Sequence, residues 1–332
     1  MTVEISIIGL GQIGASIGLA LAGQKNNIHR SGNDREPTIT HQAEKIGAID
    51  QTYLNLPAMV RQADVVILAV PVDEIYDTLK AIALDLKEGV VIVDTSPIKT
   101  AVTDWAAELL PPERHLVAWL PAINPIYLLE SSTGIEAAHA DLFKDSLVFI
   151  THPRGVNEQA VKLAADLATL VGARPFFADP VEVEGLLAAN HMLPQLAAAA
   201  VLNVTQAQPG WDEGRKLAGQ VFAQITQPLS RLDESAQWGQ SILLNHSNVV
   251  RLLDDLIAAL QELREMLARQ DGATLQKWLA QAVKGREEWL AQRHENQWGM
   301  QNQQFGELPT SGQVFGQFIG LGRRNKERKK NK

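Results

Sequence analysis

The chain has 332 residues, which is enough for two domains of ordinary size with a large core and no covalent staples. It contains no cysteine, which excludes disulfides, thiolate metal sites and cysteine nucleophiles. The net charge is −8, and because residues 323–332 carry +6, residues 1–322 carry −14, which argues against nucleic-acid binding by the body of the chain.

The first residues do not resemble a targeting segment. Glu4 stands where a signal peptide needs basic residues, and the apolar run that follows ends at Gly9. No stretch approaches the ~18 uninterrupted apolar residues of a membrane span. We therefore expect a cytoplasmic protein without membrane association. The basic segment 323–332 could bind RNA or an anionic membrane, but we expect a solvated, disordered terminus.

The first half of the chain alternates short apolar runs with amphipathic patterns. Runs of this kind predict strands at 3–8, 65–70, 90–93, 147–150 and 174–178, with helices at 12–22 and 157–171 between them. Strands separated by helices of this length are typical of βαβ units. The fold class we predict is α/β, with a Rossmann-type, doubly wound parallel sheet.

The character of the sequence changes near Asp179. The patterns beyond it predict only helices, at 181–206, 214–225, 238–269 and 274–294. We therefore predict a dinucleotide-binding domain at 1–179, an all-helical substrate and dimerisation domain at 180–298, and an extended arm with a disordered tail at 299–332. The leucine-rich helices are too apolar to face solvent, so we expect a homodimer.

The motif that carries the chemistry is Gly9-Leu10-Gly11-Gln12-Ile13-Gly14, which matches G-x-G-x-x-G. It follows a predicted strand and opens a predicted helix, the context in which this motif binds dinucleotides. Gly9 allows the tight turn, Gly11 lets the backbone approach the pyrophosphate, and Gly14 permits close packing of helix on strand. The amino end of the helix, at Gln12 and Ile13, then binds the pyrophosphate.

The dinucleotide-binding fingerprint also asks for an acidic residue about 20 positions after the glycines, at the end of the second strand of a Rossmann unit. Asp34 lies 20 residues after Gly14, which is the spacing of the carboxylate that binds the ribose hydroxyls. Arg35 follows directly and could instead bind the 2′-phosphate of NADP. Because a carboxylate repels that phosphate, Asp34 favours NAD. The alternative for Asp34 is a simple turn residue.

Two further turns should border the cofactor. Ligands of open parallel sheets bind at the carboxyl ends of the strands. Val70 and Pro71 end one predicted strand, and Ser96 lies in the loop 94–99 after the next. These segments are also ordinary strand-to-helix turns, and the two interpretations are compatible.

Several further segments, in the same order along the chain, resemble the prephenate/arogenate dehydrogenase family of tyrosine biosynthesis over roughly residues 3–300. This family oxidises a carboxylated cyclohexadienol with NAD or NADP and releases carbon dioxide, so the resemblance implies that substrate class and reaction. Besides the glycine motif, the segments are Ala15-Ser16, Leu68–Pro71, Val93–Lys99, His115–Pro121, Asp141–Phe143, Gly172–Pro175 and Leu193-Pro194.

The resemblance also implies four catalytic positions, and this chain departs from the family at each. The family has a serine after the fifth strand, a histidine in a His-Pro pair, a second histidine after Leu-Pro, and a carboxylate-binding arginine. The matching residues here are Pro97 (with Ser96 one place earlier), Leu120, Gln195 and Gln227.

Other residues could replace these groups. His191 lies one helical turn before Gln195, and as a neutral imidazole it could act as the general base, or it could be a packed interface histidine. Asn124 could hydrogen-bond substrate or cap its turn. Trp119 is expected near the cleft. The arginine could be replaced by a cation on the later helices, where the candidates are Arg215, Arg231 and Arg251.

The candidate residues outside the cofactor motif divide into a catalytic set and a substrate-binding set. We assign the catalytic role to His191 and Ser96 and substrate binding to Asn124, Gln195 and Gln227. No metal-ligand spacing, nucleophilic triad or P-loop is present in the sequence. The leading hypothesis is an NAD-dependent dehydrogenase of the prephenate/arogenate type. The alternatives are a dehydrogenase or reductase acting on another hydroxy or imino acid, and a catalytically silent dinucleotide-binding protein.

Overall fold

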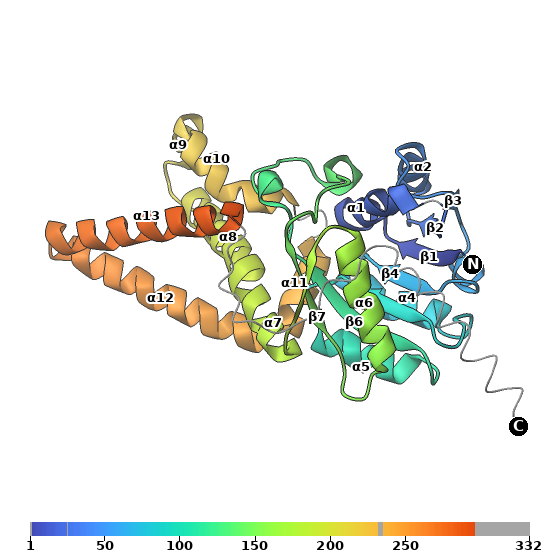
Figure 1. The fold of residues 1–332 in the computed structure, drawn as a ribbon. Helices are drawn as coiled ribbons and strands as arrows, with labels where there is room; N and C mark the ends of the chain where they lie inside the picture. Colours follow the sequence, from blue (N-terminus) through green and yellow to red (C-terminus); the bar gives the residue numbers. More distant parts are fainter. Residues whose placement is uncertain (1, 25, 232–234, 296–332) are drawn as a thin grey trace, which may run out of the picture. The chain divides into compact units, whose positions relative to one another are not determined.

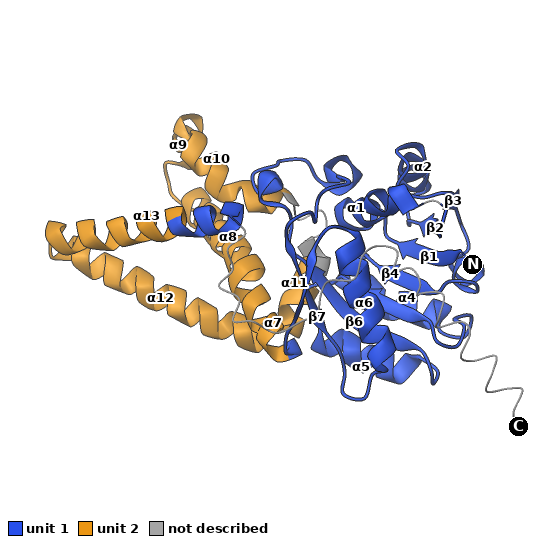
Figure 2. Cartoon of the chain, viewed as in Figure 1, with its two compact units in different colours: residues 1–180, 288–332 blue, residues 181–287 orange. Residues whose placement is uncertain are grey.

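The computed structural model describes residues 2–24, 26–231 and 235–295, and it divides into two compact units (Figure 2). Unit 1 comprises residues 1–180 together with 288–332, and unit 2 comprises residues 181–287. The last helix therefore begins in unit 2 and ends in unit 1. The predicted arm and tail, residues 299–332, lie outside the described residues.

Unit 1 is built on one eight-stranded sheet in the order β3-β2-β1-β4-β5-β6-β7-β8 (Figure 1). Neighbouring strands are parallel except for β6 and β7, so the predicted doubly wound sheet is confirmed, with two strands reversed. The strands are β1 (Val3–Ile8), β2 (Ile28–Asn33), β3 (Gln51–Thr52), β4 (Val65–Leu68), β5 (Val91–Asp94), β6 (His115–Pro121), β7 (Leu147–Thr151) and β8 (Arg174–Phe177).

The reversal of β7 has a simple cause. A parallel crossover needs a connection long and regular enough to return the chain to the starting edge of the sheet, usually an α-helix. The segment between β6 and β7 contains only the short turns η2 (Pro125–Tyr127) and η3 (Gly134–Ala137), and β7 starts from the edge where β6 ends. A helix returns before β8, which is parallel to β7.

Helices cover both faces of the sheet. One core contains side chains from α1 (Gln12–Ala20), α2 (Pro37–Lys45) and α6 (Glu158–Leu170). The other contains side chains from α3 (Leu56–Val60), α4 (Val72–Ile82) and α5 (Thr100–Leu109). Along β4, Val65 and Ile67 belong to the first core and Val66 and Leu68 to the second, so the whole strand is buried. This accounts for the continuous apolar run in the sequence.

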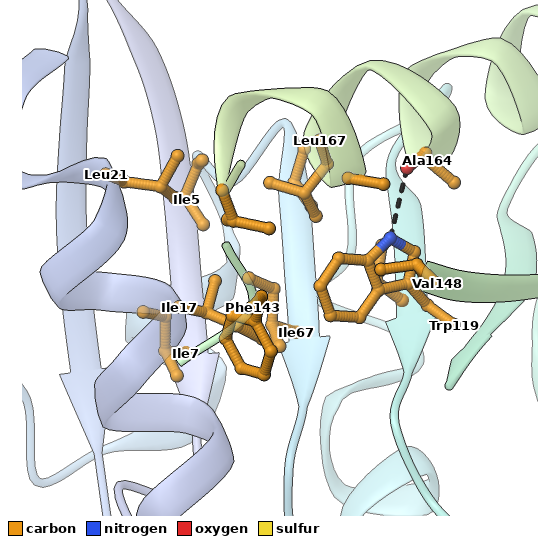
Figure 3. Packing of buried hydrophobic residues seen from close by; sticks show 14 of the residues in the cluster. Ile5, Ile7, Ile17, Leu21, Ile67, Trp119, Phe143, Val148, Ala164 and Leu167 are labelled. Atoms are coloured by element: carbon orange, nitrogen blue, oxygen red, sulfur yellow. Dashed lines mark hydrogen bonds between the residues drawn. The ribbon is translucent and has the colours of Figure 1, made fainter. Parts of the chain in front are cut away.

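Trp119 belongs to the first core and not to a cleft (Figure 3). Its side chain is fully buried, its indole Nε1 donates to the Ala164 carbonyl oxygen at 3.1 Å, and its ring meets Phe143 edge to face. The expectation that Trp119 lies near the cleft is therefore wrong. Successive side chains of a strand point to opposite faces, and Trp119 points into the layer beneath α6.

Strand β2 was not recognised from hydrophobicity because Ile28 is its only large apolar residue and polar side chains, Arg30 among them, fill most of the strand. Arg30 is fully buried, and it donates to the Asp50 carboxylate at 2.6 and 2.9 Å. It also donates to the carbonyl oxygens of Gly18, Gly47 and Ala48 at 2.6 to 3.3 Å. The guanidinium thus ties β2 to the ends of α1 and α2, and the hydrogen bonds offset its desolvation.

Unit 2 is helical throughout the residues that the structure describes. Its longest continuous run, Pro180–Gln206, contains a π-helical turn directly before Pro194, which lacks an N–H donor and clashes with the preceding turn of a regular helix. The elements are α7 (Pro180–Leu187), η4 (Ala188–Met192), α8 (Leu193–Gln206), α9 (Trp211–Leu217), α10 (Gln220–Thr226), η5 (Gln227–Arg231), α11 (Ser235–Leu244), α12 (His246–Ala268) and α13 (Gly272–Glu295).

The run Pro180–Gln206 is also long and apolar enough to cross a membrane, judged by length and composition alone. The mean hydropathy of its most apolar window is 1.3, and 22% of that window is buried within this chain. The sequence predicts a helix at 181–206, but it does not predict one apolar enough to span a membrane. A single helix of this kind is a weak indication, because helices of soluble proteins meet the same criteria.

Candidate active site

The glycine turn has the geometry that a bound pyrophosphate requires. Gly9 has φ +89°, and a Cβ there would lie 2.4 Å from the Ala69 carbonyl oxygen. A Cβ on Gly14 would lie 1.9 Å from the Gly9 carbonyl oxygen, whereas a Cβ on Gly11 would meet no atom within 4 Å. Gly9 and Gly14 are therefore required by packing, and the space beside Gly11 is open for a ligand.

Helix α1 points its amino end at that open space. Gly11 is the N-cap, and Gln12 and Ile13 form the first turn. The first N–H groups of a helix have no intrahelical acceptor, and the helix dipole makes this end positive. The first turn contains no acidic residue that would compete for these donors. This end can therefore bind a diphosphate.

Asp34 is held beside the same turn. Its Oδ2 accepts a hydrogen bond from the Leu10 backbone N–H at 2.8 Å, and its Oδ1 accepts from the Glu36 N–H at 3.0 Å. Each carboxylate oxygen can accept further hydrogen bonds, so the group remains able to bind ribose hydroxyls. Asp34 thus both fixes the turn and presents a carboxylate at the end of β2.

The next residue, Arg35, pairs with a residue from another connection. Its Nη1 lies 2.8 Å from Oε1 of Glu74, in the first turn of α4. Val70 and Pro71 form the connection between β4 and α4, with Pro71 as the N-cap of the helix. A Cβ placed on Gly9 would lie 3.1 Å from Val70 Cγ1, farther only than from two backbone atoms of Ala69. This turn therefore packs directly against the glycine turn.

The loop after β5 is organised around a buried ion pair. Lys99 Nζ lies 3.0 Å from Asp94 Oδ2, and the two side chains are 1% and 0% exposed. Ser96 is buried, its N–H donates to Asp94 Oδ1 at 3.0 Å, and its Oγ lies 3.0 Å from both Asp94 Oδ2 and the Ile98 carbonyl oxygen. These contacts give Ser96 a clear role in shaping the loop, and its catalytic and cofactor-binding roles stay predictions.

Asn124, after β6, caps its own turn. Its Oδ1 accepts from the Ile126 N–H at 3.2 Å, and its Nδ2 donates to the Asp141 carbonyl oxygen at 3.2 Å. Nearby, Arg293 of α13 donates to the Ile123 carbonyl oxygen at 2.6 Å, and burial lowers the pKa of this arginine. Sequence reasoning had proposed Asn124 for this loop but missed Arg293.

The candidates in unit 2 lie on neighbouring elements. His191 is in the π-helical turn η4, Gln195 is in the first turn of α8, and Gln227 begins η5, which packs against α8. Desolvation by surrounding protein lowers the pKa of His191 from 6.5, although the residue as a whole is exposed. Irregular π-turns are frequent at functional sites.

The arginines proposed as carboxylate ligands are ordinary surface residues where they are described. Arg215 and Arg251 are exposed and face Asp212 and Asp255 of their own helices, at 3.8 and 3.4 Å. The side chain of Arg231 lies outside the described part of the chain. Among the described residues, no group of three or more His, Cys, Asp or Glu side chains could hold a metal ion.

The structure thus gathers the predicted cofactor residues at the carboxyl ends of four adjacent strands, β2, β1, β4 and β5. The glycine motif and Asp34 were predicted from local spacing. The partners Glu74 and Lys99 were missed, because the sequence shows a charged residue but not the charge that faces it.

Comparison with known proteins assigns both halves of the chain to one family. The nucleotide-binding domain of prephenate dehydrogenase matches residues 17–176, and the dimerization domain of prephenate dehydrogenase matches residues 179–281. The cyclohexadienyl dehydrogenase of Zymomonas mobilis is 29% identical over 289 residues, which cover 85% of this chain and 94% of that protein. The prephenate dehydrogenase of Bacillus subtilis is 25% identical over 280 residues, covering 84% and 74%.

Solved structures agree on the fold. The Aquifex aeolicus prephenate dehydrogenase, in complex with hydroxyphenyl propionate and NAD+, superposes with a TM-score of 0.74 at 21% identity, covering 87% of this chain and 98% of that one. The Synechocystis arogenate dehydrogenase gives a TM-score of 0.67 at 19% identity, covering 86% and 99%. With both of its domains matched, the chain belongs to the prephenate dehydrogenase family.

Proposed function

We propose that this protein is an NAD-dependent dehydrogenase of tyrosine biosynthesis that oxidises prephenate or arogenate with loss of carbon dioxide. The observation that carries the proposal is the glycine turn at the amino end of α1, in a chain of this family. The turn is packed where packing is needed and open beside Gly11, where the cofactor would approach.

The residues at the strand ends bind different parts of the cofactor. The N–H groups at the start of α1 bind the pyrophosphate, and Asp34 binds the adenosine ribose. Val70, Pro71 and the loop containing Ser96 border the nicotinamide half. When bound, NAD supplies the hydride acceptor. The contribution of the protein is to orient the dinucleotide and to keep this edge of the sheet rigid.

The remaining chemistry is the removal of one proton and the binding of carboxylates. His191 has a lowered pKa and is therefore neutral near pH 7, which is the state that accepts a proton from the substrate hydroxyl. The amide groups of Asn124, Gln195 and Gln227 can donate hydrogen bonds to substrate carboxylates. Because the product ring is aromatic, the reaction is strongly downhill, and the tasks of the protein are to position the substrate, to accept a proton and to bind the carboxylates.

We also propose that the protein works as a cytoplasmic homodimer. The matched dimerization domain contains the apolar run Pro180–Gln206, most of which is not buried within one chain. A second copy would cover this surface and account for its apolar character without a membrane. Native mass spectrometry at micromolar concentration should return a dimer, and cell fractionation should place the protein in the soluble fraction.

The activity is tested by incubating the full-length protein with NAD and either prephenate or arogenate and following the absorbance of reduced nicotinamide. A matched pair of variants controls for folding. Gly11→Val places a side chain in the space reserved for pyrophosphate and should abolish cofactor binding. Gly23→Val is the control, because a Cβ at Gly23, in the short turn η1 (Leu21–Gln24) that follows α1, also meets nothing within 4 Å. Tight binding of NAD without turnover of either substrate would disprove the proposed reaction.

The role of His191 is tested separately. Removing a general base lowers the rate by about 10²–10⁴-fold, so His191→Ala should lose turnover while still binding NAD. His246→Ala is the control, because His246 is an exposed histidine of the same unit whose ring hydrogen-bonds to the Leu243 carbonyl oxygen and to the Ser247 hydroxyl. Equal rates in both variants would assign His191 a structural role.

A further inference from the structure

An ion pair links two connections on either side of the glycine turn. Arg35 lies two residues beyond β2, and Glu74 lies in the first turn of α4, beyond β4. In the sheet β1 lies between these strands, and Ile8 at its end is level with Asn33 of β2 and Leu68 of β4. The pair therefore joins the two strands that flank the glycine turn.

The geometry makes this contact a specific one. The Nη1–Oε1 distance is 2.8 Å, and the side chains of Arg35 and Glu74 are 54% and 28% exposed. Strands two places apart in a sheet are about 10 Å apart, a gap that only long side chains reaching from both sides can close. The guanidinium that follows Asp34 is thus directed toward a carboxylate on α4.

From this arrangement we propose that Glu74 is a specificity-determining residue, which disfavours NADP by engaging Arg35. The inference rests on the proposed NAD-dependent function. NADP differs from NAD by a phosphate on the ribose that Asp34 would bind, and a phosphate monoester carries a charge of about −1.5 to −2 at pH 7. Arg35 directly follows Asp34 in the sequence and is therefore the cation expected beside that ribose.

The charges around the pair favour the same conclusion. A 2′-phosphate would meet the carboxylates of Asp34 and Glu74 and a guanidinium whose charge Glu74 already compensates. Glu36 and Asp73, next to the two partners in sequence, add further negative charge. NAD carries no group at the 2′ position that this charge repels. Rejection of a competitor by misplaced charge is a general route to specificity.

The test compares Glu74→Gln with the wild-type protein by calorimetric titration with NAD and with NADP. Glutamine keeps the size of the side chain but removes the carboxylate charge that opposes a phosphate beside Arg35. We expect the affinity for NADP to rise about tenfold, the size of a charge-assisted Arg–phosphate contact, and the affinity for NAD to stay within about twofold. In Arg35→Gln/Glu74→Gln the gain for NADP should disappear.

The control is an ion pair with nearly the same geometry elsewhere. Arg61 and Asp85 lie 2.8 Å apart with side chains 62% and 27% exposed. Arg61 follows α3 and Asp85 follows α4, so the pair lies before the amino ends of β4 and β5, at the opposite edge of the sheet. Asp85→Asn should leave both affinities unchanged. If Glu74→Gln kept the wild-type preference for NAD over NADP, or bound both cofactors equally more weakly, the inference about Glu74 would be wrong. The proposed function would be unaffected by either result. Failure of the wild-type protein to bind either dinucleotide would overturn the proposed function as well.

Discussion

The two units of this chain differ in how much of their own surface they bury. In unit 1 even one charged pair of the candidate site is enclosed, because Asp94 and Lys99 are at most 1% exposed. In unit 2, α12 has one buried residue, Val249, and α13 has none among the side chains that the structure describes. Apolar residues of α12 such as Ile257 and Leu260 are 51% and 55% exposed.

This difference shows which part of the protein is fully packed within one chain and which part needs a second surface. The cofactor half is determined by contacts within the chain, so its residues have little freedom to change. The helical half presents apolar faces that need another surface, as expected for a dimerization domain. Substitutions should therefore have large effects on stability in unit 1 and small ones in an isolated unit 2.

The largest effect is expected at Gly14. Alanine there would place its Cβ 1.9 Å from the Gly9 carbonyl oxygen, and backbone cannot move away cheaply on either side. We expect Gly14→Ala to lose more than about 4 kcal/mol of unfolding free energy, measured by urea denaturation. Gly11→Ala, with no atom within 4 Å of its Cβ, is the control and should fold normally. A stable Gly14→Ala protein would show that α1 is not packed on β1 as described.

The next effect is expected at the buried ion pair after β5. Lys99→Met removes the charge that faces Asp94 and leaves a buried carboxylate, which costs about 3–5 kcal/mol. Lys216→Met is the control, because Lys216 pairs with Glu213 at 2.7 Å on the surface of α9, with side chains 61% and 81% exposed, where an ion pair contributes about 0–1 kcal/mol. Similar losses in the two variants would mean that the Asp94 pair is not buried in solution.

These two positions also show how far sequence alone reaches. The role of Gly14 was predicted because it depends on a local feature of the sequence, the fixed spacing of the glycines within one turn. The Asp94–Lys99 pair is close in sequence, but nothing in the sequence shows that both side chains point inward and not into solvent. Strand β2 escaped detection because most of its side chains are polar, and the carboxylate that compensates its buried Arg30, Asp50, comes from a different connection.

The candidate substrate residues were harder to predict for a different reason. The role of Asn124 depends on the loop between β6 and β7, which has no regular pattern, and Arg293 joins that loop from the end of a helix 170 residues later. The π-turn at His191 has a signal in the sequence, since Pro194 lies inside an otherwise helical run. A kink at Pro194 could have been foreseen, but not that it would produce a π-turn.

The pH dependence of stability tests the environment of His191. Its pKa is lowered in the folded protein by desolvation, so the unfolded chain binds more protons between that pKa and 6.5. Stability should therefore fall as the pH decreases through this window and level off below the folded pKa. The melting temperature of His191→Gln should fall less than that of wild type on acidification below pH 6.5. Parallel curves would mean that the imidazole is as well solvated in the fold as in the unfolded chain.

The smallest effect compares one glycine from a helix of each unit. Gly285, within α13, has open space where a Cβ would lie, whereas a Cβ on Gly18 in α1 would lie 2.1 Å from the Ala48 carbonyl oxygen. Alanine is favoured over glycine in a helix by about 1 kcal/mol, which for a protein of this size raises the melting temperature by about 2 °C. Gly285→Ala should therefore stabilise the protein and Gly18→Ala should destabilise it, although both replace a helical glycine. Calorimetry on the two variants decides the point. A destabilised Gly285→Ala would place another surface against α13 at that residue, and the contrast between the units would then hold for the single chain but not for the assembled protein.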